Sequence, residues 1–118
     1  MQDFHQLLVW QKSHAVVLEI YRLSRDFPRE ERYSLTSQLR RCAVSMPSNI
    51  AEGCGRGSNA DFARFLAMAM GSSCELEYQL LLARDLGYIE TTQHGVIEEK
   101  LREVKRMLAS LIQKVQGS

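Results

Sequence analysis

The segment LTSQLRRCAVSMPSNIAEGCGR, residues Leu35 to Arg56, decides the fold, because it places two stripes of side chains along one predicted helix. Its apolar residues recur at steps of four and three, which keeps side chains on one face of an α-helix. These residues are Leu35, Leu39, Cys42, Ala43, Met46 and Ile50. We therefore expect this face of the helix to lie in the protein core.

A polar stripe follows the same segment at the same helical spacing. Its members are Arg41, Ser45, Asn49, Glu52 and Arg56. Two interpretations are open at this point. The stripe can be a structural polar network, buried or half-buried, since polar groups remain inside proteins mainly when they are bonded to one another. Arg41 can instead belong to a basic patch with Arg40, Ser37 and Gln38, because arginines contact phosphate oxygens in a bidentate way.

Pro47 lies within this second helix and predicts a kink. A proline removes one backbone donor and crowds the carbonyl group four residues earlier. The glycines at positions 53, 55 and 57 are typical of a helix end, because glycine adopts the left-handed conformation at low cost. Between two of these glycines lies Cys54, which we expect to be an exposed thiol without a catalytic role.

Three further amphipathic helices are predicted around this segment from apolar periodicity and from capping or stop residues. Their expected spans are Phe4 or Leu7 to about Asp26, Ser58 to about Leu86, and a cap at Thr91 or Thr92 to the C-terminus. Four such helices joined by short links predict an all-α, antiparallel up-down four-helix bundle. We expect residues 1–118 to form a single domain.

The composition is that of a globular protein rather than a disordered one. Apolar residues make up 45% and charged residues 25% of the 118, and the formal net charge is +1. A nucleic-acid role therefore requires a local basic cluster or several copies of one patch. Three cysteines without a CxxC pair are typical of reduced thiols. No apolar run approaches the roughly 20 residues that span a membrane, so we expect a cytoplasmic protein without a membrane partner.

The sequence contains no arrangement typical of an enzyme. No His lies four residues from another His, so the usual metal-binding spacing is absent. The glycine-rich sequence EGCGRGS lacks the preceding strand and the GK[ST] of a phosphate loop. A nucleophile motif such as GxSxG is absent as well. We expect no enzymatic activity, no catalytic residue, no metal and no cofactor.

Several motifs at fitting separations carry a resemblance to a known family. They are VWQK at 9–12, SQLRR at 37–41, SMPSNIAEG at 45–53 and GSSCELE at 71–77. From Phe4 to about Leu111 the chain resembles the bacterial four-helix-bundle proteins encoded by intervening sequences in 23S ribosomal RNA genes. The resemblance implies a homo-oligomer, typically a pentamer, without known catalysis. More distantly, the chain is similar to the accessory protein of diversity-generating retroelements, which works with a reverse transcriptase and nucleic acid.

Two functions from different classes follow. In the first, a homo-oligomer binds RNA or DNA phosphates, without reading the base sequence, through a basic surface that symmetry repeats. The arginines expected on that surface are Arg22, Arg25, Arg40 and Arg41. In the second, the bundle is a protein-interaction scaffold or accessory protein, and its arginines pair internally with Glu52, Glu75 or Glu77. The apolar run AVVL at 15–18 favours this second function, because it extends beyond one core face.

Overall fold

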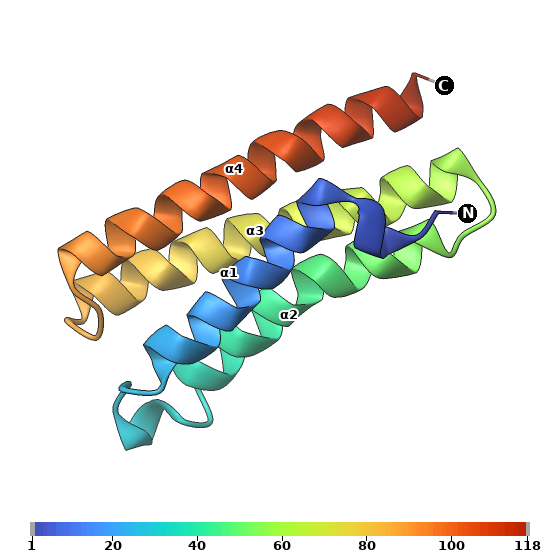
Figure 1. The fold of residues 1–118 in the computed structure, drawn as a ribbon. Coiled ribbons are helices and arrows are strands. Elements are labelled where there is room, and N and C mark those ends of the chain that lie inside the picture. Colours follow the sequence, from blue (N-terminus) through green and yellow to red (C-terminus); the bar gives the residue numbers. More distant parts are fainter. Residues whose placement is uncertain (1, 118) are drawn as a thin grey trace.

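Four long helices run back and forth along one axis in a computed structural model of the protein, which describes residues 2–117 (Figure 1). They are α1 (Leu8–Ser24), α2 (Leu35–Cys54), α3 (Asn59–Asp85) and α4 (Thr91–Gln116). Two short 3-10 helices, η1 (Phe4–Gln6) and η2 (Arg29–Glu31), precede α1 and α2. The prediction of an all-α four-helix bundle is confirmed.

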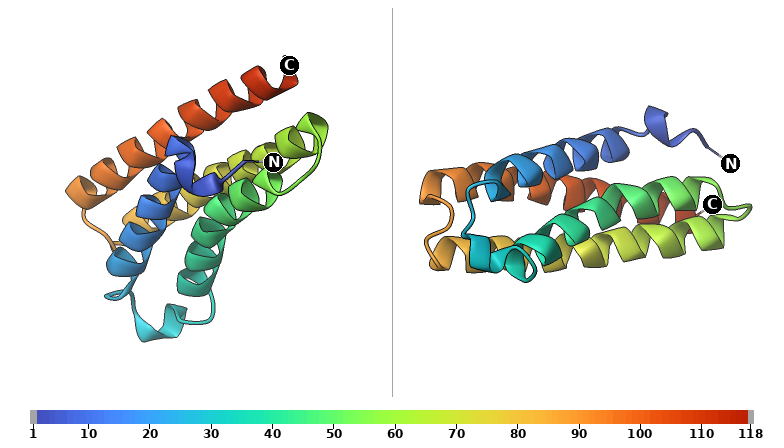
Figure 2. Two further views of the ribbon diagram at one scale, coloured as in Figure 1. Left: turned by 45° about the vertical axis from the view of Figure 1, so that its right-hand side comes forward. Right: turned by 90° about the horizontal axis from the view of Figure 1, so that it is seen from below.

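The helices form a ring in which each packs against its two neighbours, in the order α1, α2, α3, α4. Figure 2 shows this arrangement from two further sides. The apolar stripe of each helix faces inward and fills the centre with aliphatic side chains. Side chains under 2% exposed include Ile20, Leu39, Met46, Ile50, Leu66, Leu76, Leu80, Ile97, Leu101, Val104 and Leu108. Burial of one such side chain contributes about 1.5–3 kcal/mol relative to exposure.

The segment quoted first forms α2 and ends at Cys54, close to the predicted bound. All of its predicted core residues are buried, including Cys42. Pro47 lies inside the helix and is buried as well. The kink at Pro47 stays a prediction.

Gly53 allows α2 and α3 to approach each other closely near the link between them. A Cβ atom at this position would lie 2.9 Å from Phe65 Cβ and 3.0 Å from Phe62 Cδ1. Real Cβ atoms do not approach other atoms this closely, so any larger residue must displace a backbone. The glycine at position 53 is therefore needed for packing, beyond its proximity to the helix end.

The bounds of α1 and α3 agree with the sequence to within a few residues. The chain from Phe4 forms η1 and then α1, which ends two residues before the expected Asp26. The Ser58 side chain caps α3 by accepting a hydrogen bond from Asp61 N at 3.1 Å. Gly87, with φ of +80°, follows the helix and supplies the left-handed turn expected there.

The cap of α4 differs from the prediction. Glu90, rather than Thr91 or Thr92, is the N-cap residue. Its side chain accepts from the backbone of Gln93, while its own N–H donates to Gln93 Oε1 at 3.0 Å. A reciprocal pair of this kind satisfies two helix-end donors at once, which one threonine hydroxyl does not.

Candidate functional site

Two hollows lie beside α2, one on the side of α1 and one on the side of α3. The first has a volume of about 240 Å³ and is called the arginine pocket. It is lined by Ser24, Arg25, Phe27, Pro28, Arg29, Arg32, Thr36 and Arg40. The second has a volume of about 410 Å³ and is called the α2–α3 groove. It is lined by Gln38, Arg41, Cys42, Ser45, Ser72 and Glu75.

The arginine pocket is built where the chain turns from α1 into α2. The last turn of α1 and the η2 segment form one side of it. Thr36 and Arg40 lie one turn apart on α2, which puts both side chains on the same face of that helix. Residues from three elements thus converge on one hollow.

Arg40 is held in place by contacts with α1. Its Nε donates to Ser24 Oγ at 2.8 Å and its Nη2 to the Tyr21 carbonyl at 3.5 Å. The guanidinium also lies 4.8 Å from the centre of the Tyr21 ring, a distance typical of cation–π contacts. Arg40 is therefore oriented by the fold, in contrast to the exposed Arg25 and Arg29.

Thr36 places an unsatisfied hydroxyl group at the pocket. The residue is 8% exposed, and its Oγ1 has no hydrogen-bond partner within residues 2–117. Leaving a buried hydroxyl unpaired costs about 1–3 kcal/mol, so most such groups are satisfied. The Ser34 side chain does not cap α2, and Leu35 N has only a 3.5 Å contact with Glu31 Oε1. The Glu31 carboxylate is thus the acidic group found next to the positive end of the helix dipole here.

The η2 segment is fixed by a hydrogen bond that spans the bundle end. Tyr88 OH, in the α3–α4 link, donates to Glu31 Oε2 at 2.8 Å. The Ser34 hydroxyl donates to Glu31 Oε1 at 2.6 Å. The hydrogen bonds from Ser34 and then Tyr88 lower the pKa of Glu31, because both stabilise its ionised form. Glu31 therefore acts as an internal acceptor.

The arginines differ sharply in whether a carboxylate neutralises them. Those without an ion pair in the described range are Arg25, Arg29, Arg32, Arg40 and Arg41. The arginines with one are Arg22, Arg56, Arg64, Arg84, Arg102 and Arg106. All unpaired guanidiniums thus come from one stretch of 17 residues, 25–41, in a chain of net charge +1.

The four arginines predicted to form one basic surface do not share one. Arg25 and Arg40 both line the arginine pocket. Arg22 lies outside it and pairs with Glu19 at 3.1 Å. Arg41 lines the α2–α3 groove, because consecutive helical residues point about 100° apart.

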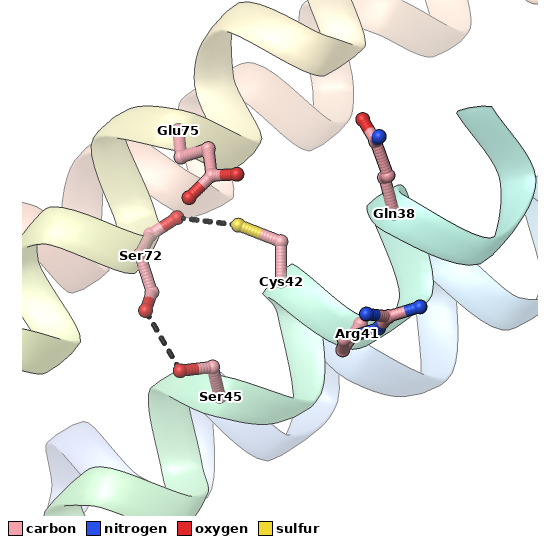
Figure 3. Close-up of a pocket in the computed structure, with 6 residues that line it drawn as sticks. All are labelled: Gln38, Arg41, Cys42, Ser45, Ser72 and Glu75. Carbon is pink, nitrogen blue, oxygen red and sulfur yellow. Dashed lines mark hydrogen bonds between the residues drawn. The ribbon is translucent and has the colours of Figure 1, made fainter. Parts of the chain in front are cut away.

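The α2–α3 groove is polar and closed at its base by hydrogen bonds between the two helices (Figure 3). Ser45 Oγ and Ser72 Oγ lie 2.8 Å apart, and Cys42 Sγ donates to the Ser72 carbonyl at 3.0 Å. Arg41 and Glu75 come from opposite helices and form no ion pair with each other in the described structure. The groove therefore offers a cation on one wall and an anion on the other.

Neither buried thiol has the properties of a nucleophile. Burial, followed by the charge of Glu75, raises the pKa of Cys42 to about 12, so this thiol stays protonated at neutral pH. The prediction that Cys54 is exposed is wrong, since it is 3% exposed. Burial raises the pKa of Cys54 as well, because its side chain turns into the bundle rather than toward the glycines beside it.

The structure divides the predicted polar network into separate contacts. Asn49 Nδ2 donates to the Ser45 carbonyl at 2.8 Å and to Ser45 Oγ at 3.0 Å. Exposed Glu52 and Arg56 pair with each other at 2.9 Å. Exposed Arg41 donates to Ser37 Oγ at 3.1 Å. The prediction of one continuous network is therefore wrong, because these side chains bond in three separate groups along α2.

Of the three glutamates proposed as arginine partners in the scaffold alternative, Glu52 pairs with an arginine, the exposed Arg56, whereas Glu75 and Glu77 have other partners. Glu77 Oε1 accepts from Lys105 Nζ at 2.6 Å, across the contact between α3 and α4. Glu75 accepts a hydrogen bond from Gln79 at 3.3 Å. The unpaired arginines therefore gain no internal carboxylate from α3.

Several residues of the arginine pocket were not identified from the sequence, among them Arg29, Arg32 and Thr36. A signal for two of them existed, since positions 32, 36 and 40 follow one another at steps of four. Arg29 carried no such signal, because the turn at Pro28 separates it from either helical pattern. Only the path of the link brings it to the pocket.

Residues 2–117 contain neither a candidate metal site nor a candidate membrane-spanning helix. No group of three or more His, Cys, Asp or Glu side chains is placed to hold a metal ion. None of the helices in this range is long and apolar enough for a membrane span.

Comparison with known proteins gives the family of the chain. A crystal structure of a protein of unknown function from the S23 ribosomal protein family, from Bacteroides thetaiotaomicron, is similar to it with a TM-score of 0.83 and 29% sequence identity. The match covers 90% of this chain and 96% of the other. No curated protein matches the chain. Residues 5–110 match the 23S rRNA-intervening sequence protein family, and the chain therefore belongs to that family.

Proposed function

We propose that the protein is a self-assembling, non-enzymatic bundle that binds phosphate groups of RNA or DNA through the arginine pocket. The observation that carries this proposal is the gathering of unpaired arginines at one end of α2. Guanidinium groups bind phosphate well because they donate two parallel hydrogen bonds. No carboxylate lines the pocket, so these donors are available to an external anion.

The chemistry of the pocket favours binding that does not depend on base sequence. Arg25, Arg29 and Arg32 are exposed at a helix end and its link. Such groups reach phosphate oxygens, which are the same in every nucleotide, whereas sequence is read at base edges. Affinity should therefore fall steeply with salt, because each phosphate contact releases counterions.

Self-assembly multiplies this small basic area. One copy has a net charge of +1, and several linked copies bind far more tightly than one. Outward-facing residues of α3 with small or apolar side chains support an assembly surface, since they recur at steps of four and three. They are Ala67, Gly71, Cys74, Tyr78 and Leu81. The family resemblance leads us to propose five copies, in the cytoplasm.

The test of phosphate binding is fluorescence anisotropy of a labelled structured RNA and a DNA of equal length, titrated with protein across a salt series. Arg25→Ala/Arg29→Ala should weaken binding about 10-fold or more and flatten the slope of log K against log salt by about 2. The matched control is Arg84→Ala/Arg102→Ala, which removes the same charge from arginines already paired with Asp85 and Glu98.

The controls give each result a distinct meaning. Equal losses in both double variants would attribute binding to total charge rather than to the arginine pocket. Absence of binding by the wild-type protein at low salt would overturn phosphate recognition altogether. Circular dichroism of each variant confirms that the fold is retained.

Assembly has its own test, light scattering coupled to size exclusion. We expect a mass about five times the 13.5 kDa of one chain. Tyr78→Lys should reduce the mass, since Tyr78 is 61% exposed on the α3 surface and a charge there opposes apolar association. Gln113→Lys, on the exposed part of α4, is the control and should leave the mass unchanged. A monomer at micromolar concentration would remove the multivalent surface.

A protein-interaction scaffold is the second candidate function. The observation that favours it is exposed apolar surface on more than one helix. Leu8 and Leu18 of α1 are 54% and 53% exposed, and Val96 of α4 is 54% exposed. A protein that assembles yet binds neither nucleic acid at low salt would favour this second function.

A further inference from the structure

The size of the arginine pocket points to a small ligand group. Its volume of about 240 Å³ is below the roughly 300–1,000 Å³ of sites that enclose a drug-sized molecule. It is also several times the roughly 30 Å³ that one water molecule occupies in the liquid. A single phosphate group fits this range, whereas a whole nucleotide must leave its base and sugar outside.

Part of the arginine pocket is held in a fixed position by contacts within the protein. Arg40 is oriented by Ser24 and Tyr21 before any ligand arrives. Arg29 follows the turn at Pro28, in the η2 segment that the hydrogen bond from Tyr88 to Glu31 holds against the bundle. Pre-oriented donors lose less conformational entropy on binding than free side chains do.

Thr36 supplies an independent observation that points to a ligand. Thr36 lines the pocket, and its buried hydroxyl has no partner among the residues described. A hydroxyl can donate a hydrogen bond to an anionic oxygen that enters the pocket. It lies in the first turn of α2, where the helix dipole also favours a negative charge.

We infer that the arginine pocket is a binding site for a phosphate monoester, the group found at the free end of an RNA or DNA strand and in small phosphates. A monoester has three unsubstituted oxygens and a charge near −2, which suits several guanidiniums without a carboxylate. An internal phosphodiester has one charge and only two unsubstituted oxygens, so it offers fewer acceptors to be shared between the guanidiniums and the hydroxyl. The inference rests on the proposed function only for the source of the phosphate.

The test compares two RNAs of identical sequence, one with a 5′-phosphate and one with a 5′-hydroxyl, each labelled at the 3′ end. Inorganic phosphate and a nucleoside monophosphate serve as small ligands, measured by isothermal titration calorimetry. The variant Thr36→Val keeps the shape of the side chain and removes its hydroxyl. Arg64→Ala is the control, because Arg64 lies in the first turns of α3, at the opposite end of the bundle, and 3.5 Å from Asp61.

We expect the 5′-phosphate to strengthen RNA binding about 10-fold, the size of one or two hydrogen bonds to a charged group. Thr36→Val should remove most of that difference, and Arg64→Ala should leave it intact. If Thr36→Val does not fold, Arg25→Gln/Arg29→Gln gives the same test, since both side chains are exposed. Circular dichroism and the melting temperature decide which variant is used.

The outcomes distinguish failure of the monoester site from failure of the proposed nucleic-acid binding. Equal binding of the two RNAs, with no heat from either small phosphate, would overturn the monoester site while leaving nucleic-acid binding in place. Small phosphates that bind to wild-type protein but not to Thr36→Val would support the site even if neither RNA binds. A preference for the 5′-phosphorylated RNA over both small phosphates would identify a strand end as the source. A preference retained in Thr36→Val and in the double arginine variant would overturn the assignment to this pocket.

Discussion

The two ends of α2 both carry arginines, but only one end leaves them without carboxylates. At the α2–α3 end, Arg56 lies 2.9 Å from Glu52 and Arg64 lies 3.5 Å from Asp61. Both guanidiniums lie 4.7 Å from the centre of the Phe65 ring. At the α1–α2 end, Arg40 also lies over an aromatic ring, that of Tyr21, but the pocket arginines have no carboxylate partner within residues 2–117. Arginine content alone therefore does not identify a phosphate-binding surface.

The difference arises from where acidic residues stand along each helix. Glu52 lies one turn before Arg56, and Asp61 lies three residues before Arg64, the spacings at which helical side chains meet. Asp26 also lies three residues before Arg29, but the turn at Pro28 breaks the helix between them. A change in chain direction thus prevents the pairing that a continuous helix would have made.

The packing that closes the α2–α3 end can be broken at Gly53. Gly53→Ala should destabilise the protein by about 1–3 kcal/mol, because the added Cβ meets Phe65 Cβ at 2.9 Å. Gly71→Ala is the control, since nothing lies within 4 Å of its added Cβ and alanine favours a helix by up to about 1 kcal/mol. Urea denaturation measures both changes. Equal stabilities would contradict the close approach of α2 and α3.

Freeing the paired arginines should make the two ends of α2 more alike. In Glu52→Gln/Asp61→Asn, Arg56 and Arg64 lose their carboxylates. The slope of log K for RNA binding against log salt should then become steeper by up to about 2. The stability cost should stay within about 1 kcal/mol per exposed pair. Anisotropy across a salt series measures the gain. An unchanged slope would show that this end does not reach nucleic acid.

Glu31, which holds the η2 segment beside the arginine pocket, should make the stability of the protein depend on pH. The pKa of Glu31 is lowered below its ordinary value of 4.5, so its contribution to stability is complete above that pH and is lost as the pH falls further. Glu31→Gln removes this contribution, and its melting temperature should fall less between pH 5 and pH 3. Exposed Glu30→Gln serves as the control and should follow the wild-type curve. Parallel curves for all three proteins would mean that Glu31 does not anchor the link.

The reaction rates of the cysteine thiols report how accessible each region is to solvent, and this is the smallest of the expected effects. Cys74 is exposed, whereas Cys42 and Cys54 are buried with raised pKa values. In dilute native protein we expect one fast-reacting thiol per chain with a disulfide reagent, and three after unfolding. Cys74→Ser should remove the fast phase. A fast reaction that persists in that variant would mean that the α2–α3 end opens readily.

The fold followed from the sequence because its signal repeats over many residues. Apolar side chains at steps of three and four define one face of each helix, and burial enforces that face. The start of α4 was missed because Glu90 is a less usual cap than threonine, and only its reciprocal bonds with Gln93 explain the choice. Single-residue bounds depend on such local bonds, whereas helix existence does not.

The candidate site followed from the sequence only in part. Arg25 and Arg40 were identified because they are basic, but Arg41 was grouped with them although it points toward α3. Arg29 joins the pocket through the path of the link, which periodicity does not describe. Periodicity groups the polar stripe along α2, but it does not give the distance to the neighbouring helix that decides which of its residues are buried.

The ring order of the helices has a consequence for the speed of folding. Each helix packs against the next one along the chain, and among the four long helices only the contact between α1 and α4 in the described range joins helices that are not consecutive. Chains dominated by such local contacts fold in microseconds to milliseconds, because little loop-closure entropy is lost before contacts form. We expect rapid folding in which α1 and α4 meet last, with the Tyr88 to Glu31 hydrogen bond, 57 residues apart, as a late step.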